Sequence, residues 1–232
     1  MVVLNETKEA ERIILKGEVG KKPTSTLFLL SRYYRQKENL SKQEIVHKLN
    51  DFMYENYKNY NPALWEDIIE NVVNKSRKYP LREINSIEIF QSELDIISEI
   101  KSIKYKKLLF VMLCFAKLYN MLSETNNGWV NTDIKDIYKI ARVNVKHKND
   151  NLNLKVNFIG EPDNTILKIT DFRELGYEYL NFIGEGRFEK CKSCKKLFKK
   201  NSNNMNYCND CQREITKTKT RIRVKKYREN NM

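Results

Sequence analysis

The amino-acid sequence predicts a mainly α-helical protein with a smaller β component, which places it in the α+β fold class. Apolar residues recur at helical spacing through the first 120 residues, whereas the alternation that favours strands comes later in the chain. The third observation is a pair of Cys-x-x-Cys motifs near the C-terminus. With 232 residues, of which 41% are apolar, the chain is long enough for one substantial core.

The first 100 residues are predicted to form a helical region. A helix is expected over residues 26–35, and Ser41-Lys-Gln-Glu44 has the pattern of a capping box that begins the next one. Asn61-Pro62 opens a third helix, because proline is favoured in the first helical turn, and Pro80 ends that segment. Ser92-Glu-Leu-Asp95 is expected to cap a short fourth helix.

Residues 101–184 form the predicted central region, and its first element is a long helix from Ser102 to Ser123. From Leu108 to Leu122 this helix is apolar almost all round, and such a helix is normally buried. We therefore expect it to be the central rod of the fold.

The pattern changes after this helix. Trp129-Val130-Asn131 favours a short strand, and Thr132 is expected to cap the helix that follows. Alternating apolar residues over 152–158 and 166–169, with turn residues at 160–164 between them, predict a β-hairpin. Helix, short strand, helix and hairpin is the element order of a winged helix, so a winged-helix-like centre is predicted.

The segment 142–151 is the place where a winged helix of this kind reads DNA. It is short and rich in asparagine, so its sequence does not favour a recognition helix. Its basic residues, Arg142, Lys146, His147 and Lys148, are candidates for phosphate contact, although a polar loop contains such residues too. Base reading and an ordinary polar loop both stay open.

Four cysteines form two closely spaced pairs, Cys191-Lys-Ser-Cys194 and Cys208-Asn-Asp-Cys211. Their spacing is that of a tetrahedral zinc site built from two knuckles. Disulfides would need an oxidising compartment, and no secretory signal is recognised in the first twenty residues. Because sulfur fills all four positions, the sequence predicts a structural Zn²⁺ ion in a zinc ribbon over residues 185–232.

Most of the positive charge lies around and after these cysteines. The net charge is +13, and residues 185–232 contribute +10 of it, with fifteen Lys or Arg against five Asp or Glu. This asymmetry indicates a polyanionic partner, while a solvated tail and docking to an acidic protein are the alternatives. The candidate nucleic-acid-binding residues are Lys192, Lys195, Lys196, Lys199, Lys200, Arg213, Lys217, Lys219, Arg221, Arg223, Lys225, Lys226 and Arg228.

The lysines near the first knuckle have a second role, because they partly neutralise the charge of four thiolates on one dication. The basic tail beyond Cys211 contains three threonines that weaken helix propensity, so it is compatible with ordering only on a partner. If the tail is helical, one basic stripe is formed by Lys217, Arg221, Lys225 and Arg228.

Catalytic and membrane functions are not indicated. The two histidines, His47 and His147, lack a motif partner, and Gly17-Glu-Val-Gly20 does not begin a phosphate-binding loop. The longest apolar run, residues 108–116, is too short to cross a bilayer, and Cys114 within it is expected to be a core residue. We expect a non-enzymatic, cytoplasmic protein without a small-molecule substrate.

One stretch of the second half, Asp171-Phe-Arg-Glu-Leu-Gly-Tyr-Glu-Tyr-Leu180, lies between the central region and the cysteines. With the central helix, Trp129-Val130-Asn131, Phe198, Tyr207-Cys208 and the Arg-rich tail, it makes residues 90–232 resemble a phage and mobile-element protein family of low-GC bacteria. The resemblance implies a winged-helix-like region followed by a C-terminal zinc ribbon.

Together these observations predict a zinc-ribbon nucleic-acid-binding protein of a mobile element. DNA is the expected partner, contacted at its phosphates by the basic C-terminus in replication or transcription control. The alternative is a protein-interaction adaptor or inhibitor of host or phage machinery, with a purely structural zinc ribbon. The expected domains are residues 1–100, 101–184 and 185–232.

Overall fold

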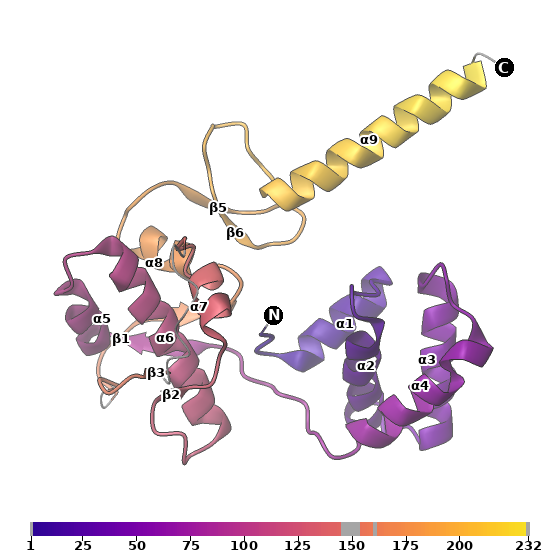
Figure 1. Ribbon diagram of the computed structural model, residues 1–232, viewed down its shortest axis with the longest axis horizontal. Helices are drawn as coiled ribbons and strands as arrows, with labels where there is room; N and C mark the ends of the chain where they lie inside the picture. The colour runs from indigo at the N-terminus through magenta and orange to yellow at the C-terminus, as the bar shows by residue number, and fades with distance from the viewer. Residues whose placement is uncertain (1, 145–153, 160–161, 231–232) are drawn as a thin grey trace. The chain divides into compact units, whose positions relative to one another are not determined.

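The computed structural model describes residues 2–144, 154–159 and 162–230 (Figure 1). The chain divides into two compact units, an N-terminal unit of Val3–Asn85 and a C-terminal unit from Ser86 onward. Helices dominate and the strands form small two-stranded sheets, so the predicted mainly α-helical (α+β) class is confirmed.

The helices of the N-terminal unit begin and end at residues suited to those positions. Ser41 Oγ accepts a hydrogen bond from the Glu44 amide, and the Glu44 carboxylate accepts one from the Ser41 amide, which confirms the predicted capping box. Asn61 caps the helix that Pro62 opens, and Gly17 ends the first helix in the left-handed conformation, with φ of 59°. The helices are α1 (Glu6–Lys16), α2 (Pro23–Lys37), α3 (Lys42–Asn56) and α4 (Pro62–Ser76).

The apolar faces of these helices meet in one core inside the N-terminal unit. Helix α2 packs against α1, α3 and α4, so it is the central element. Every buried member of this core lies between Ala10 and Val73. The largest fully buried side chains are Leu27, Leu30, Ile45, Leu49, Met53 and Ile69.

A buried ion pair crosses this unit beside the core. The Arg32 guanidinium donates to both carboxylate oxygens of Glu6, at 2.8 and 2.9 Å, and to the Pro80 carbonyl at 3.1 Å. The Arg82 amide also donates to Glu6, at 2.8 Å. Burial works to raise the pKa of Glu6, but these hydrogen bonds outweigh it and hold that pKa below its usual value.

The C-terminal unit is built around α6 (Ile103–Leu122), as predicted for a buried central rod. Residues on all sides of this helix are buried, and the rings of Phe110 and Phe115 each lie 5.1 Å from a partner ring, of Tyr179 and Phe172 respectively. The other helices described in this unit are α5 (Gln91–Ser98), α7 (Ile134–Ile140), α8 (Leu175–Phe182) and α9 (Asn209–Asn230).

Helix α5 begins two residues earlier than its sequence pattern indicated. Its cap is made by Glu93, whose buried carboxylate accepts a hydrogen bond from the Phe90 amide at 2.9 Å; Ser92 is therefore not the cap. The same carboxylate binds Lys117 Nζ of α6 at 2.7 and 2.8 Å, and that ammonium lies 3.7 Å from the centre of the Phe90 ring. This pairing accounts for a lysine on the buried helix.

Three antiparallel strand pairs are present in the described part of the C-terminal unit. Strand β1 (Ile87–Phe90) pairs with β4 (Thr165–Ile169), and β2 (Trp129–Val130) pairs with β3 (Leu154–Lys155). The third pair, β5 with β6, belongs to the cysteine region. Strand β1 and helix α5, whose residues fall within the predicted domain 1–100, lie in the C-terminal unit.

In the described residues, the segments 152–158 and 166–169 do not pair with each other as the predicted hairpin requires. Both segments contain strands, β3 and β4, but each pairs with a different partner from earlier in the chain. An alternating pattern identifies which face of a strand is buried, but it does not identify the strand that pairs with it. In addition, the sequence pattern did not indicate that residues 87–90 form a strand. The described strands therefore do not include the β-hairpin that would form the wing of a winged helix.

The helix after β2 also differs in detail from the prediction. Asp133, and not Thr132, caps α7, because its carboxylate accepts a hydrogen bond from the Lys135 amide at 2.7 Å. Within the segment 142–151, Arg142 has a left-handed backbone, with φ of 53°, and its side chain is paired with Glu174. Lys146, His147 and Lys148 lie outside the described residues, so their phosphate contacts, and base reading by this segment, stay untested.

Candidate metal centre

The first cysteine pair lies in the connection of a short β-hairpin. Strands β5 (Phe188–Lys190) and β6 (Leu197–Lys199) pair in antiparallel register, and the turn between them carries Cys191 and Cys194. The Cys191 carbonyl accepts from the Lys195 amide at 2.9 Å, and Lys195 takes the left-handed conformation with φ of 60°. This tight turn brings the two sulfur atoms to the same side of the hairpin.

The second pair differs from the predicted second knuckle. Cys208 directly precedes α9, its carbonyl accepts a hydrogen bond from the Gln212 amide at 2.9 Å, and Cys211 lies in the first turn. The pair is thus positioned by the start of a helix and not by a second hairpin. A helix brings residues three apart onto one face, so both thiols point toward the first pair.

The four sulfur atoms fit a single metal ion. All four lie within 4.8 Å of one another, and Cys194 Sγ is 3.7 Å from Cys208 Sγ. Tetrahedral zinc with Zn–S bonds of about 2.3 Å separates its sulfur ligands by about 3.8 Å. Cys191 and Cys208 are buried, Cys194 and Cys211 are partly buried, and Phe198, Met205 and Tyr207 pack around them.

Backbone amides around the sulfur atoms favour thiolates. The Cys208 amide donates to Cys191 Sγ at 3.3 Å. Burial works to raise the pKa of Cys191, but hydrogen bonds from backbone amides lower it to about 6. Burial raises the pKa of Cys194 to about 12. A metal ion bound here would stabilise the thiolate of Cys194 and release its proton.

This donor set is compatible with a structural zinc site. Four sulfur ligands complete a tetrahedral shell, which leaves no coordination position for a water or substrate. Across the described residues, these four cysteines are the only group of three or more His, Cys, Asp or Glu placed to hold a metal ion. Cys114 is not part of it: the residue is buried in α6, and burial raises the pKa of its thiol.

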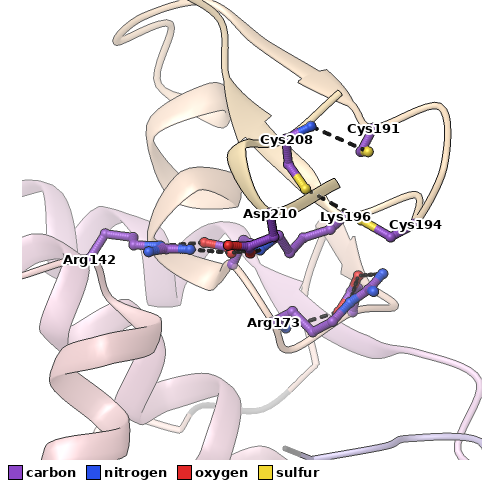
Figure 2. A network of polar contacts seen from close by, with 9 residues as sticks. Arg142, Arg173, Cys191, Cys194, Lys196, Cys208 and Asp210 are labelled. Carbon is purple, nitrogen blue, oxygen red and sulfur yellow. Dashed lines mark hydrogen bonds and ion pairs between the residues drawn. The ribbon is translucent and has the colours of Figure 1, made fainter. Parts of the chain in front are cut away.

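An ion-pair network joins this metal centre to the helical part of the C-terminal unit (Figure 2). Lys196, between the cysteine pairs, lies 3.1 Å from the carboxylates of Glu174 and Asp210. Arg142 binds the same Glu174 through two hydrogen bonds. Glu174 immediately precedes α8 and is 3% exposed, while Asp210 lies in the first turn of α9, so one lysine ties both helices to the hairpin.

Helix α8 contains the Leu-Gly-Tyr-Glu-Tyr-Leu stretch singled out in the sequence, and its glycine has a packing role. A Cβ atom on Gly176 would lie 2.3 Å from the Ala141 carbonyl oxygen, so the helix approaches the end of α7 more closely than any other residue permits. The Tyr177 ring lies 5.2 Å from that of Phe188 at the start of the hairpin. The stretch therefore contacts the first strand of the hairpin that carries Cys191 and Cys194.

Sequence reasoning missed the polar partners of this centre. Glu174 was part of the singled-out stretch, but nothing in the sequence indicated that Lys196, Arg142 and Asp210 converge on it. Lys196 was predicted to bind nucleic acid; in the structure it lies in ion pairs with Glu174 and Asp210, and Lys200 lies 2.6 Å from Glu189. The other predicted lysines near the first knuckle, Lys192, Lys195 and Lys199, are exposed.

The remaining predicted contact residues all lie on α9, which forms a helix of 22 residues. Every residue from Thr216 to Glu229 is exposed. The three threonines expected to weaken this helix direct their hydroxyl groups to the carbonyl four residues earlier, at 2.9 to 3.0 Å. The predicted basic residues on α9 are Arg213, Lys217, Lys219, Arg221, Arg223, Lys225, Lys226 and Arg228.

Comparisons with protein-family models, curated proteins and solved structures find no match for this chain. None of the described helices combines the length and the apolarity that a bilayer crossing requires.

Proposed function

We propose that this protein binds nucleic acid through α9, and that the metal centre holds the beginning of that helix in place. The observation that carries the proposal is the continuity of the two features: Cys211 belongs to the first turn of α9, and the exposed basic residues follow on the same helix. Eight Lys or Arg on α9 stand against three Asp or Glu.

The physical basis is the release of counterions from the phosphate backbone. Lys and Arg that neutralise phosphates displace condensed cations, which gives affinity that depends little on base sequence and strongly on salt. Exposed side chains reach phosphates without breaking internal contacts. Two ion pairs on α9 join Lys217 to Glu214 and Lys225 to Glu229. Because both pairs are exposed, they contribute little stability, and a phosphate can take the place of the carboxylate.

The metal centre contributes order, and no catalytic step is assigned to it. Four thiolates on a dication carry a net charge of −2 beside the N-terminus of α9, and the positive end of a helix dipole favours that charge. The centre therefore stabilises the first turn of a helix whose later residues lack a core of their own.

A salt titration of the full chain tests the proposal. With about six phosphate contacts on duplex DNA, log K is expected to fall against log salt with a slope near −5. A chain that ends at Glu214 keeps all four cysteines and should lose most of this slope. Binding with no salt dependence, or a slope unchanged by the truncation, would overturn the proposal.

The alternative proposal is an adaptor or inhibitor that binds a host or phage protein. It is favoured by large apolar side chains on the surface of the N-terminal unit: Leu15 is 87% exposed, Tyr54 79% and Leu64 72%. A single stoichiometric protein partner that survives nuclease treatment and is lost on Leu64→Ser would support it. A role in the replication or transcription control of a mobile element rests on the sequence resemblance.

A further inference from the structure

From Lys217 on, the basic residues of α9 fall on two opposite flanks of the helix. Successive residues are about 100° apart around a helix axis. One flank, here the first flank, consists of Lys217, Arg221, Lys225 and Arg228. The other, the second flank, lies nearly opposite and consists of Lys219, Arg223 and Lys226. A helix that touched a polyanion from one side would need only one of them.

The two faces between these flanks differ in charge. From residue 216 to the end of the helix, one contains Thr216, Thr220, Val224 and Tyr227 and no charged residue; we call it the uncharged face. The opposite face contains Thr218, Ile222 and Glu229, so it includes a carboxylate that phosphates would repel. The helix therefore has a side suited to approach a nucleic acid and a side suited to solvent.

The dimensions of α9 match one groove of duplex DNA. Its 22 residues span about 33 Å, and a helix with its side chains is about 10–12 Å wide. The major groove of B-form DNA is about 12 Å wide and has a phosphate backbone along each side. A helix in this groove meets phosphates on both flanks and base edges on one face.

We propose that α9 binds B-form duplex DNA in its major groove, with both flanks on the phosphate backbones and the uncharged face toward the bases. This inference rests on the proposed nucleic-acid binding and adds the form of the partner and the orientation of the helix. The major groove of A-form RNA is too narrow for side chains to enter, and a single strand offers phosphates to one flank only.

The uncharged face also sets the expected sequence preference. The hydroxyl protons of Thr216 and Thr220 are directed to carbonyl oxygens of the same helix, which leaves their methyl groups toward the groove. Methyl and other apolar groups contact the thymine methyl group and read no donor or acceptor pattern. We expect weak base discrimination and binding dominated by the flanks.

Matched triple variants of the full chain test the two-flank arrangement. Lys217→Gln/Arg221→Gln/Lys225→Gln and Lys219→Gln/Arg223→Gln/Lys226→Gln each remove two lysines and one arginine. On duplex DNA each variant should make the salt slope less negative by about 2 to 3, because three phosphate contacts are lost. Lys58→Gln/Lys75→Gln/Lys78→Gln removes the same charge from the N-terminal unit and should leave the slope unchanged.

The outcomes separate this inference from the proposed function. If only one flank affects the slope, the protein still binds nucleic acid but the groove arrangement is wrong. Equal affinity for a duplex DNA, an RNA duplex and a single strand of the same sequence would also overturn it. If no salt-dependent binding occurs with any of them, the proposed function itself fails.

A pair of single variants tests which face meets the bases. Thr220 and Thr218 are both exposed and make the same bond to a carbonyl four residues earlier, but they lie on opposite sides of α9. Thr220→Glu places a carboxylate between the two phosphate backbones and should weaken duplex binding at least tenfold. Thr218→Glu should weaken it no more than threefold, and the reverse order would overturn the orientation.

Discussion

Individual side chains in this protein have roles that depend on partners far away in the sequence. Lys196 illustrates this, since its charge neighbours are Glu174, 22 residues earlier, and Asp210, 14 residues later. Its sequence context is a run of exposed lysines, so only the folded chain distinguishes it from them. Local patterns such as the Ser41 capping box were predicted correctly because both partners lie within one turn.

Replacing Lys196 should destabilise the metal centre without changing its exposed charge pattern. Lys196→Gln removes the cation between Glu174 and Asp210 and is expected to lower the free energy of unfolding by about 2 kcal/mol, the usual value for hydrogen bonds to charged groups. Urea denaturation, monitored through the helicity of α9, measures this loss in the free energy of unfolding. Lys192→Gln, at an exposed position nearby, is the control, and an equal loss in both variants would contradict the role assigned to Lys196.

Glu6 should make the N-terminal unit sensitive to acid. Its pKa is below the usual 4.5, so its stabilising effect is complete above pH 4.5 and is lost as the pH falls through the lowered value. Glu6→Gln is expected to cost about 3 kcal/mol at pH 7 and to flatten the loss of stability in acid, because a buried ion pair is broken.

Trp65 fluorescence in a Trp129→Phe background reports this unit alone, since these are the two tryptophans of the chain. The exposed Glu11→Gln is the control and should change neither stability nor its pH profile. An acid profile for Glu6→Gln that parallels the parent protein would show that another carboxylate is responsible.

Among the elements, most helices were predicted from short-range patterns, although the caps of α5 and α7 were not. The strand partners, which are defined by long-range pairing, were predicted wrongly. The cysteine spacing indicated a metal site because both pairs and their turns are local. Strands β3 and β4 were placed almost correctly, but their partners β2 and β1 lie 24 and 75 or more residues earlier. Alternation along a strand contains no information about such a neighbour.

Loss of one metal ligand should unfold the cysteine module and spare the rest. Cys208→Ser leaves three sulfur ligands and is expected to remove most of the metal-linked folding free energy, which is on the order of 10 kcal/mol in small zinc modules. Metal content should fall from one ion per chain toward zero, and trypsin should cleave within residues 185–232 while α6 stays protected.

Cys114→Ala provides the matched control because the fifth cysteine lies in the core of α6. It should keep one metal ion per chain and lose only about 1 kcal/mol of stability. A loss of metal from Cys114→Ala, or full metal content in Cys208→Ser, would show that the four-cysteine assignment is wrong.

At the scale of the whole molecule, the division after Asn85 predicts how fragments behave. Residues 3–85 contain all members of the N-terminal core, so this fragment should be helical and unfold cooperatively by circular dichroism. Residues 3–100 add β1 and α5 without their partners and expose Ile87, Ile89 and Ile97, which are at most 1% exposed in the full chain. The longer fragment should aggregate more readily, and equal solubility of the two would contradict the observed strand pairing.

The pairing of β1 with β4 also has a consequence for biosynthesis. The N-terminal unit has its whole core once residue 85 has left the ribosome, whereas β1 must wait for Thr165–Ile169 before it can pair. Contacts between residues so far apart form slowly, because a long loop must close first. We therefore expect nascent chains to carry a finished first unit for several seconds while the second is still unpaired, at roughly 5–20 residues per second.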